Sequence, residues 1–153
     1  MILWRISDYA DLSGTGGTKY SARWHHAGRP IIYLAEHPAL ALLETLVHLE
    51  LSMEDMPDNY QLLEVEVPDD SINGAVLDDP RWKLNRQLTM DMGSQWLRDQ
   101  TSLLLRVPSA IVPGWNYLLN PLHPKASDCQ IKSVHQHPYD PRLFSITLPD
   151  SSQ

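Results

Sequence analysis

The sequence predicts a single α+β domain with a mixed, mainly antiparallel β core and flanking helices. Two observations carry this prediction: short apolar or alternating runs recur between turn residues, and only two segments have the composition of helices. A length of 153 residues suits one domain with a substantial core. We therefore expect one folded domain over residues 1–148 and a disordered tail over residues 149–153.

Five segments have the pattern of β-strands. Residues 60–67 alternate, with Leu63, Val65 and Val67 on one side and two glutamates on the other, which is typical of a half-buried strand. The other candidates are apolar runs bounded by turn residues, at 2–6, 30–35, 103–112 and 116–121.

A proline interrupts the run at residues 103–112. Because proline cannot donate to a sheet ladder, this run is either an edge strand or two short strands with a break at Pro108 and Ser109. A break would expose Ser109 at a strand end. A serine in that position is either a hydrogen-bonded turn residue or a group that meets a ligand.

The helix predicted at residues 39–51 contains the most informative carboxylate. Proline precedes it, which suits a first helical turn, and good helix formers follow. Its apolar side chains share one wide arc, and Ala41, Thr45 and His48 lie opposite. Glu44 falls at the edge of the arc, where a carboxylate is half drawn into the core. This position favours a group that meets a ligand in a partly dry cleft.

Three further segments have weaker patterns. A second, short helix is predicted within residues 89–98. Residues 68–80 are interpreted as a turn-rich linker, and residues 133–145 as a polar segment broken by prolines.

Composition and charge narrow the classes of partner. The net charge is −7, from 12 basic and 19 acidic residues, which disfavours direct nucleic-acid binding. The single cysteine, Cys129, excludes an internal disulfide and a cysteine zinc site, and fits a reducing compartment. No apolar run approaches the length of a membrane span, and no signal peptide is recognisable. We expect a soluble, cytoplasmic protein without a membrane partner.

The N-terminal glycines and the histidines match no ligand motif. Gly14, Gly16 and Gly17 allow close backbone approach to a ligand, but their spacing fits neither a P-loop nor a dinucleotide fingerprint, so a flexible connection is the simpler interpretation. His135 and His137 could share a strand face, but no further ligand lies at close spacing. We expect no metal site.

Several motifs together resemble the RES-domain family, which is named for its Arg, Glu and Ser. They are Arg23-Trp24, Gly28, YLAEHPALALLETLVH at residues 33–48, RVPS at 106–109, NYLLNP at 116–121 and DPRLF at 140–144. The resemblance extends from Trp4 to about Phe144, and the motif at 33–48 is the most specific. Many members have two glycines and then Arg-Trp-Asn, whereas this sequence has Ser21-Ala22-Arg23-Trp24-His25.

The resemblance implies a fold, an activity and a partner. The fold would be similar to that of ADP-ribosyltransferases, and the domain at residues 1–148 would bind NAD as its substrate. The protein would be the toxin of an Xre/RES-type toxin–antitoxin pair, degrading NAD by phosphorolysis or hydrolysis, with inorganic phosphate or water as acceptor. Its partner would be a helix-turn-helix, Xre-like antitoxin that blocks the cleft.

Cleavage of the nicotinamide–ribose bond requires two charged groups. Positive charge develops on the ribose as nicotinamide leaves, so an anion near the sugar stabilises the transition state. Glu44 can supply this anion. Arg23 can hold the diphosphate with its planar guanidinium.

The remaining candidate site residues are three neutral side chains and a second arginine. Tyr33 offers a flat ring against the nicotinamide or ribose, and Ser109 a hydroxyl that orients the ring or the amide. Arg5 is a second candidate for phosphate contact, and Asn116 is assigned to ligand binding by the family match. The structural alternatives are a strand-end ion pair for Arg5, a core position for Tyr33 and a turn for Ser109. We predict catalytic roles for Arg23, Tyr33, Glu44 and Ser109, and NAD binding by Arg5, Arg23, Tyr33 and Asn116.

Two other functions remain open at this point. The same cleft could serve a protein ADP-ribosyltransferase, in which a protein is the acceptor. A function of another class is an inactive binding module that sequesters a helix-turn-helix antitoxin. The sequence chooses neither the acceptor nor the oligomeric state, and a homodimer is left open.

Overall fold

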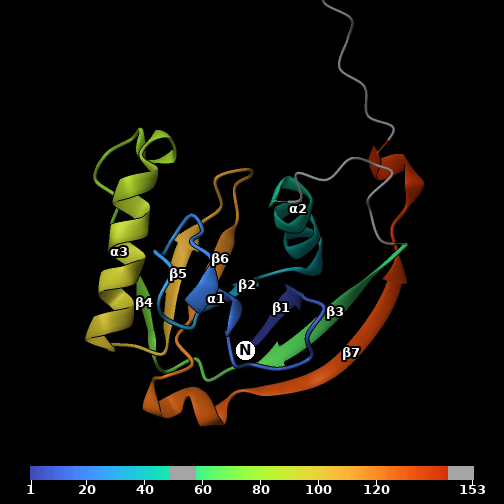
Figure 1. The fold of residues 1–153 in the computed structure, drawn as a ribbon, viewed down its shortest axis with the longest axis horizontal. Coiled ribbons are helices and arrows are strands. Elements are labelled where there is room, and N and C mark those ends of the chain that lie inside the picture. The colour runs from blue at the N-terminus through green and yellow to red at the C-terminus, as the bar shows by residue number, and fades with distance from the viewer. Residues whose placement is uncertain (49–57, 145–153) are drawn as a thin grey trace, which may run out of the picture.

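The structure, a computed structural model, describes residues 1–48 and 58–144. Within them, seven strands form one sheet in the order β4-β5-β6-β2-β1-β3-β7 (Figure 1). The β4–β5 pair is parallel, and the other pairs are antiparallel. The predicted α+β class with a mixed, mainly antiparallel sheet is therefore confirmed.

The strands and helices follow the chain in a simple order. The strands are β1 (Ile2–Ile6), β2 (Ile32–Ala35), β3 (Asn59–Glu66), β4 (Ile72–Gly74), β5 (Leu104–Pro108), β6 (Trp115–Leu119) and β7 (Gln130–Pro138). The α-helices are α1 (Gly16–Lys19), α2 (Pro38–His48) and α3 (Arg86–Asp99), and short 3-10 helices lie at Trp82–Leu84, Pro124–Asp128 and Pro141–Phe144.

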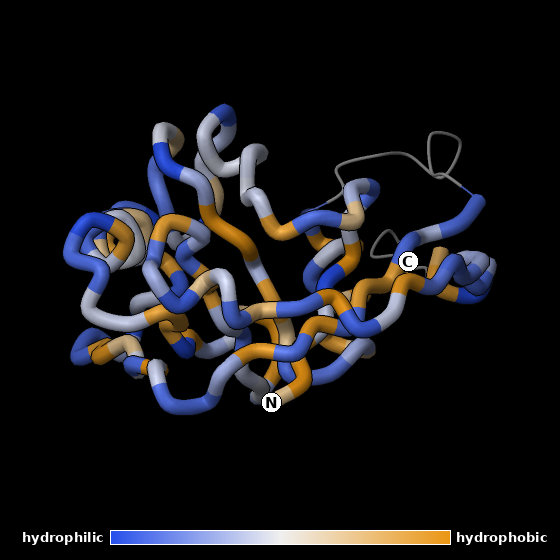
Figure 2. The backbone as a smooth tube through the Cα atoms, turned by 90° about the horizontal axis from the view of Figure 1, so that it is seen from below, coloured by the Kyte–Doolittle hydropathy of each residue, from blue (hydrophilic) through white to orange (hydrophobic). Residues whose placement is uncertain are grey.

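The core lies on both faces of the sheet, because apolar side chains alternate along its central strands. On β5, Leu104 belongs to one apolar cluster with Leu3 and Leu63, whereas Leu105 belongs to another with Trp96 of α3. A third cluster joins α2 to β1 and β2. The hydrophobic backbone segments accordingly run through the middle of the molecule, with hydrophilic segments around them (Figure 2).

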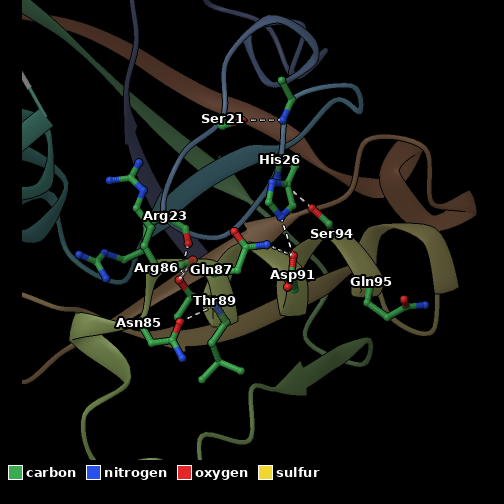
Figure 3. Close-up of polar contacts among 12 residues, drawn as sticks. Ser21, Arg23, His26, Asn85, Arg86, Gln87, Thr89, Asp91, Ser94 and Gln95 are labelled. Atoms are coloured by element: carbon green, nitrogen blue, oxygen red, sulfur yellow. Dashed lines mark hydrogen bonds and ion pairs between the residues drawn. The ribbon is translucent and has the colours of Figure 1, made fainter.

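Residues 21–26 are docked onto α3 at close range. A side chain at Gly93 would place its Cβ 1.6 Å from the Trp24 carbonyl oxygen, so only glycine allows this approach. The His26 amide donates to Ser94 Oγ at 2.9 Å, and the His26 ring contacts Asp91 at 2.6 Å. Figure 3 shows His26 directed at both residues. The segment therefore has a fixed position against α3.

Two weakly patterned segments contain strands that their sequence patterns did not predict. Residues 68–80 contain β4, a three-residue strand at the sheet edge that is too short to show alternation. Residues 133–145 contain much of β7, the nine-residue strand at the other edge. β7 pairs with β3 along one side and is mostly exposed, so it needs no apolar alternation.

The other predicted elements are present, although the second helix, predicted as short within residues 89–98, is the 14-residue α3. The chain leaves its strand at Pro108, as the proline predicts, and α2 begins at Pro38. The last residues of the predicted helix at 39–51 and the predicted tail at 149–153 lie outside the described residues. No helix within residues 1–48 and 58–144 combines the length and apolar character needed to cross a membrane.

Candidate active site

A cavity of about 320 Å³ lies where β1, β2 and α2 meet, and we call it the Glu44 cavity. β1 contributes Trp4, Arg5 and Ile6; β2 contributes Tyr33, Leu34 and Ala35; α2 contributes Ala41, Glu44, Thr45 and His48; Ala22 and Asn116 complete the lining. The wall is largely apolar with a few polar groups, which is the usual make-up of a small-molecule site.

One face of α2 forms a wall of this cavity. Ala41, Glu44, Thr45 and His48 have the i, i+3, i+4, i+7 spacing that aligns side chains on a helix. The sequence interpretation placed three of them opposite the apolar arc, away from the core, whereas Ala41 is only 6% exposed. That part of the interpretation is wrong for Ala41, which packs in the cluster that joins α2 to β1 and β2, whereas His48 at the end of the same face is exposed.

Glu44 is held by two hydrogen bonds to one of its oxygens. Ser109 Oγ donates to Glu44 Oε1 at 2.7 Å, and Asn116 Nδ2 donates to the same oxygen at 2.8 Å. No described residue hydrogen-bonds to the second oxygen, Oε2. The carboxylate is therefore fixed in orientation while one oxygen keeps its accepting capacity for a ligand.

Two strand ends bring these partners to Glu44. Ser109 directly follows β5 and is only 4% exposed, and Asn116 is the second residue of β6. Ser109 Oγ also accepts from the Ile111 amide at 3.1 Å, which stabilises the turn between the strands. The interpretation of Ser109 as a hydrogen-bonded turn residue is therefore confirmed, and its hydroxyl also binds the Glu44 carboxylate. Contact of Ser109 with a ligand stays a prediction.

Tyr33 is fixed by a residue that sequence reasoning did not select. Its hydroxyl lies 2.7 Å from His25 Nδ1 and accepts from the Trp24 amide at 3.3 Å. His25 Nε2 lies 3.2 Å from the Gly17 carbonyl, which can only accept, so Nε2 carries the proton and Nδ1 accepts from Tyr33. The tyrosine ring is therefore held at the cavity wall by its hydroxyl.

Burial shifts the pKa of both members of this pair. It lowers the pKa of the His25 imidazole, which is only 2% exposed, and hydrogen bonds from its ring partly offset the effect. It raises the pKa of the Tyr33 phenol well above its ordinary range. Both groups are therefore neutral near pH 7, and neither supplies charge to the site.

The two predicted arginines have different positions. Arg5 lines the Glu44 cavity, donates to the Asp11 carbonyl at 3.0 Å, and has its pKa lowered by burial, an effect that Asp11 opposes. Arg23 does not line this cavity. Its guanidinium donates to the Lys83 carbonyl at 3.3 Å. The Arg23 carbonyl accepts from the Thr89 hydroxyl on α3 (Figure 3).

The predicted site residues thus fall into two groups. Arg5, Tyr33, Glu44 and Asn116 line one cavity, and Ser109 joins them through its bond to Glu44. Arg23 stands apart from the lining. Sequence reasoning missed His25, Thr45 and His48. The i+4 spacing from Glu44 could have indicated His48. No local pattern indicates Thr45 or the contact of His25 with Gly17.

No group of three or more His, Cys, Asp or Glu side chains within the described part of the chain is placed to hold a metal ion. His135 and His137 do share a face of β7, with ring centroids 6.0 Å apart. Their neighbour is the Tyr60 ring, which stacks on His137.

Comparisons with known proteins identify the family of the chain. The RES domain profile matches residues 2–142. "Toxin Res" of Pseudomonas putida KT2440 is 51% identical over 147 residues, which cover 94% of this chain and 100% of that protein. The "Prs ADP-ribosylating toxin" of Sphingobium sp. strain YBL2 is 39% identical over 155 residues, covering 92% and 95%.

A solved structure has the same fold. The crystal structure of the M. tuberculosis MbcT-MbcA toxin-antitoxin complex contains a chain that superposes with a TM-score of 0.71 at 17% identity, covering 94% of this chain and 86% of that one. At such low identity the likeness concerns the fold alone. The profile match over nearly the whole length, together with close relatives that carry the family name, shows that this chain belongs to the RES domain family.

Proposed function

We propose that this protein consumes NAD by cleaving its nicotinamide–ribose bond in the Glu44 cavity, with inorganic phosphate or water as acceptor. The observation that carries the proposal is the Glu44 carboxylate, fixed at Oε1 by Ser109 and Asn116 and lining a largely apolar cavity with Arg5. A fixed anion and a guanidinium on one cavity wall match the charges that develop in this reaction.

Glu44 acts on the sugar in this mechanism. As the bond to nicotinamide lengthens, its electron pair leaves with the nicotinamide nitrogen and positive charge grows on the ribose. The carboxylate stabilises that charge, and Oε2 can accept from a ribose hydroxyl. Phosphate or water then donates an electron pair to the anomeric carbon, and the proton lost from the acceptor passes to solvent.

The other residues position the substrate. Arg5 is the guanidinium that lines the Glu44 cavity, so we assign it the main contact with the diphosphate. Arg23 keeps a supporting role in which its guanidinium meets the substrate outside this cavity. Tyr33 presents its ring as a flat surface, and Ser109 and Asn116 orient the carboxylate.

We further propose that the protein is the toxin of a type II toxin–antitoxin pair and that its partner is a helix-turn-helix antitoxin. This rests on the names of relatives, two of which are called toxins at 51% and 39% identity. An antitoxin that covers the Glu44 cavity would stop NAD consumption by excluding the substrate.

A second candidate is transfer of ADP-ribose to a protein. The Sphingobium relative, named as an ADP-ribosylating toxin, supports it. The first step would be the same, because Glu44 would stabilise the same sugar cation. The acceptor would then be a side chain of the target protein.

Product analysis tests the proposal and separates the acceptors. Purified protein is incubated with NAD, with and without phosphate, and nicotinamide and the ribosyl product are measured. Phosphate-dependent release that gives ADP-ribose-1″-phosphate indicates phosphorolysis, and free ADP-ribose indicates hydrolysis. Release that requires an added protein and labels it indicates the transferase. Absence of nicotinamide under all three conditions would contradict an NAD-consuming function and favour a binding module.

A further inference from the structure

A second cavity of about 510 Å³ adjoins the Glu44 cavity, and the two share one lining residue, Arg5. Its wall comes from the segment between β1 and the end of α1, including Tyr9, Asp11, Lys19 and Tyr20. This segment holds the three glycines that match no phosphate motif. The mechanism proposed above uses none of its residues apart from Arg5.

The wall of this second cavity is preformed. Gly14 has a φ of +66°, and its carbonyl accepts from the Gly17 amide at 3.0 Å and the Ile31 amide at 3.3 Å. A Cβ at Gly14 would lie 2.8 Å from the Ile31 nitrogen, so the loop packs against the residue that directly precedes β2. Asp11 also accepts from the Ser13 hydroxyl at 2.8 Å. The loop is therefore an ordered surface rather than the flexible connection that its glycines suggested.

The chemistry of this wall suits a nucleotide. Tyr9 and Tyr20 are each 73% exposed, which leaves two aromatic rings accessible at the cavity. Aromatic rings stack on nucleobases without requiring a particular base. Arg5 and Lys19 supply positive charge for phosphate groups, and the Asp11 carboxylate can accept from sugar hydroxyls.

Volume supports the same assignment. Pockets for drug-sized ligands measure roughly 300–1,000 Å³, and the Glu44 cavity lies at the lower end of that range at about 320 Å³. A dinucleotide has two nucleoside halves joined by a diphosphate. The Glu44 cavity suits one half, so the other half needs a separate space on the far side of a phosphate-binding group.

We propose that this second cavity binds the adenosine half of the dinucleotide, with Arg5 contacting the diphosphate where the cavities meet. This inference rests on the proposed function, because it divides one substrate between two adjoining sites. The adenine ring lies against Tyr9 or Tyr20, and Lys19 contacts the adenosine phosphate. The nicotinamide half then reaches Glu44.

Gly16 allows a test that leaves the fold intact. It lines the second cavity, and a Cβ there would meet no other atom within 4 Å. Gly16→Leu therefore adds a side chain at the cavity lining, and its Cβ contacts no protein atom. Gly74 is the matched control, because a Cβ there meets only the end of Arg106 at 3.9 Å and the residue belongs to β4, at the edge of the sheet.

Two measurements make the test. The first is calorimetric binding of adenosine diphosphate, which lacks nicotinamide. We expect Gly16→Leu to weaken binding at least about tenfold, and Glu44→Gln and Gly74→Leu to change it less than about twofold. The second is the ratio of kcat/KM for NAD to that for nicotinamide mononucleotide, which has the same scissile bond without adenosine. This ratio should fall at least about tenfold in Gly16→Leu and stay constant in Gly74→Leu.

The outcomes separate this inference from the proposed function. If Gly16→Leu binds adenosine diphosphate as the unmodified protein does and keeps its preference for NAD, the adenosine half lies elsewhere and the inference is wrong. If adenosine diphosphate binding depends on Gly16 but neither substrate releases nicotinamide, the nucleotide site stands and the proposed cleavage is wrong. The double variant Tyr9→Ala with Tyr20→Ala, which changes only exposed side chains, should reproduce the loss of binding.

Discussion

Arg5 and Arg23 carry the same guanidinium in different surroundings. Arg5 projects from β1 into the wall of the Glu44 cavity and is partly desolvated. Arg23 belongs to the segment docked on α3, and its guanidinium is bonded to the Lys83 carbonyl. The comparison shows that the strand position of Arg5 brings its cation to this cavity. The docked residues 21–26, the Arg23 segment, contribute instead through Ala22, which lines the cavity, and His25, which holds Tyr33.

The largest expected effect comes from Glu44, the carboxylate proposed to stabilise the positive charge on the ribose. Glu44→Gln keeps the shape of the side chain but removes the charge, so turnover of NAD should fall about 10²–10³-fold, or ~3–4 kcal/mol. Glu66→Gln is the control, because Glu66 is exposed and pairs with Lys132. Nicotinamide release at the normal rate from the Glu44 variant would remove Glu44 from the mechanism.

Gly93→Ala should separate the Arg23 segment from α3. The new Cβ would overlap the Trp24 carbonyl, so the backbone must shift, and we expect a loss of about 3 kcal/mol in the free energy of unfolding. Urea denaturation measures this loss. Gly16→Ala, where a Cβ meets open space, should leave stability unchanged or slightly raised. Equal stability of the two variants would show that the segment is not tightly docked.

Replacing each arginine by lysine sharpens the comparison directly. Lysine keeps the charge but loses the planar fork that matches phosphate oxygens. We expect Arg5→Lys to raise KM for NAD about tenfold, and Arg23→Lys to raise it less than about threefold. Steady-state kinetics on the two variants show which substitution raises KM for NAD more. A larger effect at Arg23 would mean that the diphosphate lies outside the Glu44 cavity.

The smallest effect concerns the pH dependence of stability. The lowered pKa of His25 keeps it neutral in the folded protein, whereas the unfolded chain takes up a proton near pH 6.5. The unfolded state then binds more protons, so this contribution to stability is complete above pH 6.5 and decreases as the pH falls below it. One proton limits the slope to about 1.4 kcal/mol per pH unit.

His25→Asn tests this effect by removing the titrating group. Unfolding free energies measured between pH 7 and 5 should fall less steeply for the variant. Parallel curves for both proteins would show that His25 is not buried in its neutral form.

Much of this fold could be predicted because local patterns determine it. Pro38 marks the start of α2 and Pro108 the end of a strand, and both act through their own backbone chemistry. β4 and β7 could not be predicted in the same way. Their edge positions depend on pairing with β5 and β3, which are remote in sequence, and not on an apolar pattern of their own.

The candidate site also has one residue that the sequence could indicate and others that it could not. Glu44 could be selected because a carboxylate at the edge of an apolar helical face is costly without a partner. Its partners Ser109 and Asn116 are more than 60 residues away, at 65 and 72 positions along the chain, and only the folded sheet brings them together. Which arginine lines the cavity is likewise a property of the sheet, since nothing near Arg5 or Arg23 in sequence encodes it.

A crystal structure of the Glu44→Gln variant with NAD tests the central claim most directly, because this variant should bind the substrate without cleaving it. The account predicts the nicotinamide ribose beside residue 44 in the Glu44 cavity, with the diphosphate at Arg5. NAD bound beside Arg23 and Lys83, with the Glu44 cavity empty, would contradict it.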